Sequence, residues 1–309
     1  MQELLEQVRG EVAKAVVGQD EAVEALVVAA VLGGHVLLEG PPGTAKTLLA
    51  RAAARALGSD FARIQFTPDM LPSDVTGTVA LRGGELVFRP GPIFANVVLA
   101  DEINRTPPKT QAALLEAMEE RQVTVDGESH ALPDPFLVVA TQNPIEYEGT
   151  YPLPEAQLDR FLMRVDVGYP DEAEERALLR LARDGLAPAA LDAIMPVVDG
   201  DVLRAARTRV AAVAVAPEVE AFVVAVVRRT RELPSVELGA SPRAAVHLLG
   251  AGRAAATIAG RDFLTPDDVV RVAPRVLAHR LLLSPEAELE RFTAAAAIET
   301  ALAAVPVPR

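Results

Sequence analysis

Two spacings of hydrophobic residues alternate along the first half of the chain. Apolar residues three and four positions apart predict amphipathic helices, and short apolar runs bounded by turn residues predict strands buried on both faces. The predicted helices cover residues 4–17, 19–33, 46–57 and 107–122, and the predicted strands cover residues 35–38, 61–66, 97–100 and 136–140. Because strands and helices alternate, we expect an α/β domain whose sheet is mostly parallel.

The pattern changes after about Pro170, where the strand signals fade. Predicted helices cover residues 171–182, 201–210, 217–231, 241–260 and 266–283, and each begins near a capping residue or a proline. We therefore expect an α/β core over residues 1–185, followed by a smaller all-helical domain over residues 186–309. The join is expected between Gly168 and Asp201, where glycine and proline punctuate the chain.

Two segments of the first half fit neither a helix nor a buried strand. Residues 66–94 interrupt an expected helix with proline, aspartate and glycine. Residues 123–135 alternate into the pair Asp126-Gly127, which is a strong signal for a two-residue hairpin turn. The simpler alternative for both segments is a solvated loop.

Composition narrows the class of protein. The 309 residues carry a formal net charge of −13, which argues against nucleic-acid binding because phosphate neutralisation needs a basic face. The absence of cysteine excludes disulfides and thiolate metal sites, and the histidines (His35, His130, His247 and His279) lack the spacing of metal ligands. No apolar run reaches the length of a membrane span and no signal peptide is visible, so we expect a cytoplasmic protein without membrane insertion.

The strongest chemical signal follows the strand predicted at residues 35–38. A turn rich in glycine and proline leads into Lys46 and Thr47, which open the next predicted helix. Backbone N–H groups in such a turn converge on a phosphate, and the helix N-terminus adds a positive dipole. Lys46 can reach the outer phosphates of a nucleotide and Thr47 can ligate Mg²⁺, although Ala45 stands where the general pattern has glycine. The predicted phosphate-binding residues are Gly40, Pro41, Pro42, Gly43, Thr44, Ala45, Lys46 and Thr47.

Two carboxylates end the strand predicted at residues 97–100. Asp101 can hold the shell of a Mg²⁺ ion together with Thr47, and Glu102 can polarise a water for attack on a terminal phosphate. Carboxylates at the end of a strand are usually only solvated. The preceding phosphate loop makes the catalytic interpretation the stronger one.

Two further polar residues leave alternatives open. Asn143 follows the strand predicted at residues 136–140 and can place an uncharged donor and acceptor near an attacking water, but an asparagine before proline also suits a turn. Arg160 lies on a short amphipathic turn, where it can neutralise charge in phosphoryl transfer or form a surface ion pair of little energetic weight.

The ordered set of motifs resembles the AAA+ ATPases, and most closely their MoxR family, over nearly the whole chain. Alanine before the loop lysine is common in that family, so Ala45 supports the resemblance. The fold that it implies is a three-layer core with a phosphate loop, carrying hairpins inserted near residues 66–94 and 123–135, and a small helical lid. Besides the loop at residues 40–47, the matching motifs are Val17-Gly18-Gln19, Asp101-Glu102-Ile103-Asn104-Arg105, Gln142-Asn143-Pro144, Pro154-Glu155-Ala156-Gln157, Leu158-Asp159-Arg160-Phe161, Gly239-Ala240-Ser241-Pro242-Arg243 and Gly260-Arg261-Asp262.

The resemblance also implies roles for single residues. Asp101 would be the magnesium residue, Glu102 the catalytic glutamate and Asn143 the first sensor. Arg160 would be an arginine finger acting on ATP held by a neighbouring subunit, and Arg243 the second sensor, acting in cis or in trans. The backbone of Val17, Gly18 and Gln19 would line the adenine pocket, although Gln19 also suits the start of a helix.

At the level of function, the resemblance implies Mg²⁺-dependent hydrolysis of ATP to ADP and phosphate at the subunit interfaces of a ring, expected to be a hexamer. The expected output is chaperone-like remodelling, maturation or metal-cofactor loading of a partner, such as a separately encoded protein with a von Willebrand A domain. Two alternatives stay open. One is the motor subunit of a magnesium-chelatase-like metal-insertion enzyme, and the other is a nucleotide-gated assembly scaffold.

Overall fold

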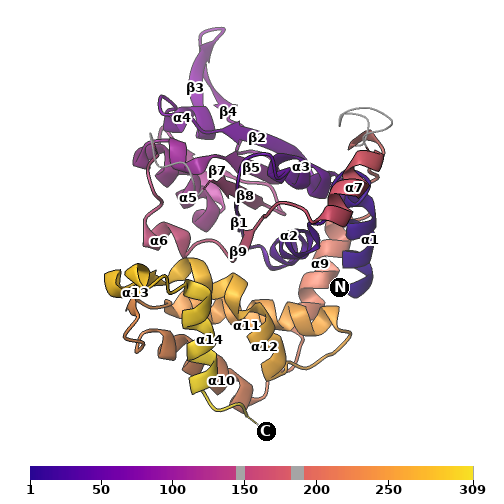
Figure 1. Ribbon diagram of the computed structural model, residues 1–309. Helices are drawn as coiled ribbons and strands as arrows, with labels where there is room; N and C mark the ends of the chain where they lie inside the picture. The colour runs from indigo at the N-terminus through magenta and orange to yellow at the C-terminus, as the bar shows by residue number, and fades with distance from the viewer. Residues whose placement is uncertain (144–149, 182–190, 309) are drawn as a thin grey trace. The chain divides into compact units, whose positions relative to one another are not determined.

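The computed structural model describes residues 1–143, 150–181 and 191–308 (Figure 1). The chain divides into two compact units. The unit that we call the sheet unit contains Leu4–Leu153 and Val165–Leu203, and the helical unit contains Met1–Glu3, Pro154–Arg164 and Arg204–Arg309. The domain boundary predicted between residues 185 and 186 lies outside the described residues.

A five-stranded sheet forms the centre of the sheet unit, in the order β2-β5-β8-β1-β9. Adjacent strands are parallel from β2 through β5 and β8 to β1. All residues of β5 are buried, as are the first five of β8, so the sheet is covered on both faces. The mostly parallel α/β core predicted from the sequence is confirmed. The strands are β1 (Val36–Glu39), β2 (Phe61–Gln65), β5 (Val97–Asp101), β8 (Leu137–Gln142) and β9 (Met163–Asp166).

Helices α2 and α3 pack against this sheet, and the local chemistry explains their limits. Gly33 ends α2 in a left-handed conformation with φ 68°, which glycine adopts without steric cost. Helix α1 ends at Val12, earlier than predicted. Ala15 and Val16 are buried and continue the helical spacing of apolar residues, but they follow the helix in a turn. The helices of this part are α1 (Gln2–Val12), α2 (Asp20–Leu32), α3 (Lys46–Ala56), α4 (Pro72–Thr76), η1 (Ile103–Arg105), α5 (Pro108–Glu120) and α7 (Glu172–Leu181). Helix α9 (Gly200–Ala211) begins in the sheet unit and continues into the helical unit.

Both inserted segments form antiparallel hairpins. Strands β3 (Gly77–Arg82) and β4 (Glu85–Pro90) follow the short helix α4 and extend away from the five-stranded sheet (Figure 1). Strands β6 (Gln122–Val125) and β7 (Glu128–Ala131) turn at Asp126 and Gly127, both of which have positive φ. The hairpin turn predicted from Asp126-Gly127 is confirmed.

The helical unit is built mainly from α10, α11, α12 and α14. Helices α11 and α12 pack together, and α14 packs on α10 and α12. A small core joins Leu233 and Val236 to Ala297 and Ala301 of α14. The helices are α6 (Glu155–Leu158), α10 (Pro217–Thr230), α11 (Pro242–Ile258), α12 (Pro266–Leu277), η3 (Ala278–Arg280), α13 (Pro285–Leu289) and α14 (Ala294–Ala304).

The predicted helix over residues 266–283 is wrong beyond Leu277. The chain tightens into the 3-10 turn η3, and Leu282–Leu283 then forms the strand β11, which pairs with β10 (Val236–Leu238). The apolar run at residues 281–283 continued the pattern of α12, and its pairing partner lies too far away in sequence for a local pattern to reveal. In the described residues, no helix is long and apolar enough to cross a membrane.

Candidate functional site

The loop between β1 and α3 has the backbone shape that a phosphate loop needs. Gly43 has φ 84°, and Ala45 has φ 60° and ψ 22°, in the left-handed region. A Cβ placed on Gly43 would meet no atom within 4 Å, so the backbone there faces open space. A Cβ on Gly40 would collide with the carbonyl oxygen of Val167, so that glycine permits close packing of the loop against the next segment. Ala45 adopts at some conformational cost the geometry that glycine adopts freely.

Lys46 is folded back onto this loop. Its Nζ donates to the carbonyl oxygens of Gly40 and Pro41, at 2.8 Å each, and to Thr44 Oγ1 at 3.3 Å. Partial burial lowers the pKa of the Lys46 ammonium, while Asp101 and Glu102 oppose the shift. Three uncharged oxygen atoms of the loop therefore accept the hydrogen bonds of the lysine.

Asp101 collects donors from three elements. Its Oδ2 accepts from Thr47 Oγ1 at 3.1 Å and from Arg63 Nη2 at 2.7 Å, and its Oδ1 accepts from Thr141 Oγ1 at 2.6 Å. The Asp101 side chain is only 10 % exposed. A buried carboxylate beside a threonine hydroxyl supplies the hard oxygen ligands that Mg²⁺ prefers, so these residues fit that ion.

Glu102 is held in place beside Asp101. Its backbone is left-handed, with φ 57° and ψ 49°, and its N–H donates to Thr141 Oγ1 at 2.9 Å. Its Oε2 accepts from Gln65 Nε2 at 2.8 Å and pairs with Arg105 Nε at 3.0 Å. Left-handed backbone is uncommon for a residue with a side chain and is often found at functional sites.

These groups line one cavity of about 450 Å³ at the carboxyl edge of the parallel strands. That edge is where ligands bind in open α/β sheets. Asn143, which follows β8 and is buried, also lines the cavity. The structure thus brings together Lys46, Thr47, Asp101, Glu102 and Asn143. Pro144, which belonged to the same motif, lies outside the described residues.

Arg63 and Gln65 are site residues that the sequence reasoning missed. Both lie on β2, within the segment 61–66 that the hydrophobic pattern predicts to be a buried strand. Residues two apart on a strand share a face, so two polar side chains at positions 63 and 65 could have indicated a polar stripe beside Asp101. Gln65 is the register partner of Asp101.

The remaining predicted residues are not among those that line the described cavity. Arg160 and Arg243 belong to the helical unit, on the turn after α6 and in the first turn of α11. Val17, Gly18 and Gln19 precede α2 and do not line the described phosphate cavity. Gly18 has φ 74° and lies against the Glu174 carboxylate.

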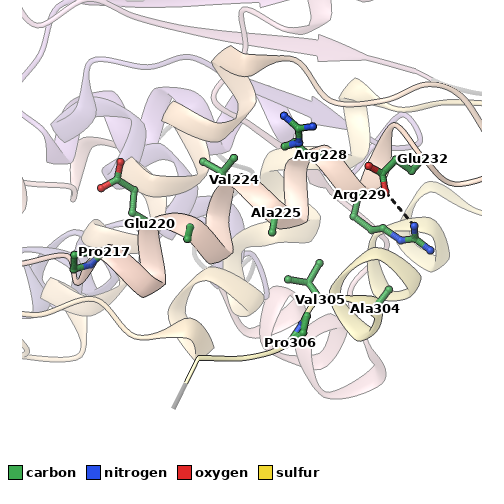
Figure 2. Close-up of a pocket in the computed structure, with 11 residues that line it drawn as sticks. Pro217, Glu220, Val224, Ala225, Arg228, Arg229, Glu232, Ala304, Val305 and Pro306 are labelled. Carbon is green, nitrogen blue, oxygen red and sulfur yellow. Dashed lines mark hydrogen bonds and ion pairs between the residues drawn. The ribbon is translucent and has the colours of Figure 1, made fainter.

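A second hollow, of about 890 Å³, lies in the helical unit between α10 and the end of α14 (Figure 2). Its floor is apolar, with Val224, Ala225 and Val305, and Arg229 at its edge pairs with Glu232 at 3.2 Å. Although it is larger, it contains none of the predicted site residues. The cavity beside Lys46 is therefore the candidate site.

Comparison with known proteins agrees with this geometry. Residues 35–163 match the ATPase family associated with various cellular activities (AAA), and residues 228–301 match the AAA lid domain. The chain is 45 % identical to Chaperone MoxR1 of Mycobacterium tuberculosis, over 99 % of this chain and 82 % of that protein. It is 37 % identical to Protein MoxR of Methylorubrum extorquens, over 91 % of this chain and 88 % of that protein.

A solved structure gives the same result for the fold. A Cytophaga hutchinsonii protein, described as a candidate ATPase, superposes with a TM-score of 0.91 at 39 % identity, covering 100 % of this chain and 96 % of that one. A three-layer core with a phosphate loop and a helical lid is therefore the fold of this chain. On its sequence, its fold and the residues gathered at the cavity, the chain belongs to the MoxR family of AAA ATPases.

Proposed function

We propose that this chain hydrolyses ATP to ADP and phosphate in a Mg²⁺-dependent reaction. The observation that carries the proposal is the convergence of Lys46, Thr47, Asp101 and Glu102 on one cavity at the carboxyl edge of the sheet. An ammonium group, a hydroxyl and two carboxylates beside a phosphate loop are the parts that phosphoryl transfer to water requires. Membership of an ATPase family supports the same reaction.

Each residue has a distinct role in this proposal. Lys46 leaves the carbonyl oxygens of its own loop and binds the outer phosphates. Thr47 and Asp101 hold Mg²⁺, which neutralises charge on the phosphate oxygens when bound. Asn143 orients the attacking water, and Glu102 accepts a proton from that water as it attacks.

Glu102 must change partners before it can act as a base. In the structure its carboxylate is engaged by Gln65 and Arg105, at 2.8 Å and 3.0 Å. Both contacts hold the carboxylate in one orientation. We therefore infer that these two contacts restrain the base, and that nucleotide binding exchanges them for a contact with the attacking water.

The remaining roles extend beyond one chain. We propose that Arg160 acts on ATP held by a neighbouring subunit of a ring, as a hexamer would allow, and that Arg243 senses nucleotide in cis or in trans. The backbone of Val17, Gly18 and Gln19 would contact adenine. These assignments rest on the family membership and on the position of each residue in its motif.

The output that we propose is chaperone-like remodelling or maturation of a partner protein, including its loading with a metal cofactor. The name of the Mycobacterium tuberculosis relative, Chaperone MoxR1, supports this output. A separately encoded partner with a von Willebrand A domain, and action in the cytoplasm, remain predictions.

The test is the replacement Glu102→Gln. We expect ATP binding to stay within about twofold, while turnover falls by at least about 100-fold, because general-base catalysis contributes about 10²–10⁴ in rate. Binding is measured with a fluorescent ATP analogue and turnover by phosphate release. The matched control is Glu116→Gln, which removes an exposed carboxylate on α5. Unchanged turnover in Glu102→Gln would exclude Glu102 as the base.

A further inference from the structure

A buried arginine crosslinks three segments of the helical unit. Arg280, in η3, has a side chain that is 1 % exposed. Its Nε donates to Asp159 Oδ1 at 2.8 Å, and its Nη2 donates to the carbonyl oxygen of Phe161 at 2.5 Å and to His247 Nδ1 at 2.6 Å. The end of α12, the middle of α11 and the turn after α6 therefore meet at one guanidinium.

The Asp159 carboxylate extends this network to the start of α11. Ser241 Oγ donates to Asp159, at 2.9 Å from both carboxylate oxygens. Ser241 is also the N-cap of α11, because its Oγ accepts from the backbone N–H of Ala244 at 3.2 Å. We call Asp159, Ser241, His247 and Arg280 the Asp159 cluster.

The charges of the Asp159 cluster balance. Burial lowers the pKa of Arg280 to about 10, so the guanidinium stays charged near neutral pH. Burial and the neighbouring Arg280 lower the pKa of His247 to about 4, so its ring is neutral and Nδ1 can accept. Within the cluster the Arg280 guanidinium pairs with the Asp159 carboxylate, while the charge of Arg243 lies near enough to act on both Arg280 and His247. A buried pair with several hydrogen bonds has a defined geometry.

This cluster joins the two arginines to which the proposed function gives catalytic roles. Asp159 directly precedes Arg160, and Ser241 lies two residues before Arg243 on α11. We propose that the Asp159 cluster is a positioning device that makes the Arg160 turn and the start of α11 move as one body, so that nucleotide sensed at Arg243 changes the placement of Arg160. This proposal rests on the proposed function, and it adds a physical link between neighbouring ATP sites.

Ser241 makes the direct contact between the Asp159 carboxylate and the start of α11, and this contact can be removed without removing a charge. Replacing Arg280 would leave Asp159 without its cation and is expected to destabilise the unit as a whole. Ser241→Ala removes one N-cap bond and the contact with Asp159. Ser284→Ala is the matched control, because Ser284 caps α13 through Ala287 N at 3.3 Å and is followed by proline in the same way. Ser241→Thr retains the hydroxyl and should behave as the wild type.

The first readout is hydrogen exchange of the amides of residues 155–162, with and without a non-hydrolysable ATP analogue and Mg²⁺. In the wild type, Ser241→Thr and Ser284→Ala, the analogue should change the exchange rates of these amides by at least about fivefold. This factor is the lower end of the range typical of allosteric coupling. In Ser241→Ala that change should disappear, although the analogue still binds. The second readout is steady-state hydrolysis, in which Ser241→Ala should lower kcat by at least about fivefold with KM within about twofold.

Equal behaviour of Ser241→Ala and Ser284→Ala in both readouts would overturn the proposal. The two levels of failure are distinguishable. A wild-type protein that neither binds nor hydrolyses ATP would refute the proposed function. Hydrolysis that depends on Arg160 but is indifferent to Ser241→Ala would refute only the link through the Asp159 cluster.

Discussion

At the scale of single residues, Arg63 donates to the same oxygen of Asp101 as Thr47 does, although Asp101 and Thr47 are the residues that would hold Mg²⁺. Its Nε and Nη2 lie 3.0 Å and 2.7 Å from Asp101 Oδ2, the oxygen that also accepts from Thr47. Two cations cannot share one carboxylate oxygen without repulsion. Arg63 is therefore expected to move aside when Mg²⁺ binds, and its contact with Asp101 opposes that binding.

Arg63→Met should consequently lower the Mg²⁺ concentration needed for nucleotide binding. Arg63 is 49 % exposed, so its ion pair is worth no more than about 1 kcal/mol, and the expected shift is about two- to fivefold. The measurement is a Mg²⁺ titration of fluorescent ATP binding. Arg51→Met, an exposed arginine on α3, serves as the control. A requirement for more Mg²⁺ in Arg63→Met would contradict the competition.

His247 gives the helical unit a pH-dependent stability. Its pKa, about 4 in the folded protein, lies below the ordinary 6.5, so the unfolded chain binds more protons between these values. The stabilisation by neutral His247 is complete above pH 6.5 and is lost as pH falls toward 4. Over that interval it amounts to about 3 kcal/mol, and about 2 kcal/mol is lost by pH 5.

The variant His247→Asn isolates this effect. Asparagine offers an acceptor where Nδ1 lies but does not titrate. Between pH 7.5 and pH 5, the variant should lose about 2 kcal/mol less unfolding free energy than the wild type, measured by urea denaturation. Both proteins retain a further contribution of the same sign from buried His279, whose pKa burial also lowers. Parallel pH profiles of the two proteins would refute the role of His247.

At the scale of elements, helix starts could be predicted better than helix ends. Pro217 and Pro266 each open a helix at the predicted position, because proline suits the first turn, where its missing N–H leaves no bond unmade. Ends depended on distant partners. Helix α12 stops at Leu277 because Arg280 turns inward to Asp159 and the next residues pair with β10, and neither partner is local in sequence.

The β3–β4 hairpin exposes apolar side chains near its tip. Leu81 and Leu86 are register partners and are 73 % and 75 % exposed. An exposed pair contributes little to folding, so its apolar character suits contact with a partner protein. The alternative is a solvated hairpin without such a contact.

The double variant Leu81→Ser with Leu86→Ser separates these possibilities. Its unfolding free energy should change by less than about 1 kcal/mol, since exposed sites contribute within about 0.5 kcal/mol each, and basal ATP hydrolysis should be unchanged. The amount of partner protein that the Glu102→Gln form captures should fall sharply when the two leucines of the hairpin are also replaced. Leu238→Ser, at an exposed leucine of β10, is the control. Undiminished capture would favour the solvated hairpin.

At the scale of the whole molecule, the division into two units places Arg160 in the helical unit, whereas the sequence pattern predicts the α/β core to extend over residues 1–185. Residues 154–164 lie between two stretches of the sheet unit along the chain, but they cluster with the helical unit. The contacts of Asp159 with Ser241 and Arg280 explain this membership, because both partners come from distant parts of the chain. The spacing of hydrophobic residues could not reveal a polar contact between residues so far apart in the sequence.

The ring that we propose makes a prediction about mixtures. If Arg160 acts as an arginine finger, Arg160→Ala should hydrolyse ATP at least about 10³-fold more slowly than the wild type. Glu102→Gln should be equally inactive, but mixing the two proteins should restore activity, because some interfaces combine an intact Glu102 with an intact Arg160. Phosphate release across mixing ratios measures this. A mixture that stays inactive, although the subunits exchange, would count against action in trans.

The sequence could predict which side chains gather at the candidate site, but not which neighbouring side chains hold them. Lys46, Thr47, Asp101 and Asn143 stand in motifs whose spacing follows from strand, turn and helix, and the structure brings them to one cavity. Arg63 and Gln65 carry no motif, and only pairing of β2 with β5 places them beside the carboxylates. The α/β core and the helical region that follows it were predictable because helix and strand patterns change visibly along the chain.

The fold of Lys46 onto the carbonyl oxygens of Gly40 and Pro41 has a kinetic consequence. A loop that satisfies its own lysine keeps its shape without an anion, so an arriving phosphate needs only a side-chain rotation rather than a refolding of the backbone. Side-chain rotations take picoseconds to nanoseconds, far faster than loop or domain motions. Nucleotide entry should then be limited by diffusion to the cavity, and the slow step of each cycle should be sought among the larger movements that follow.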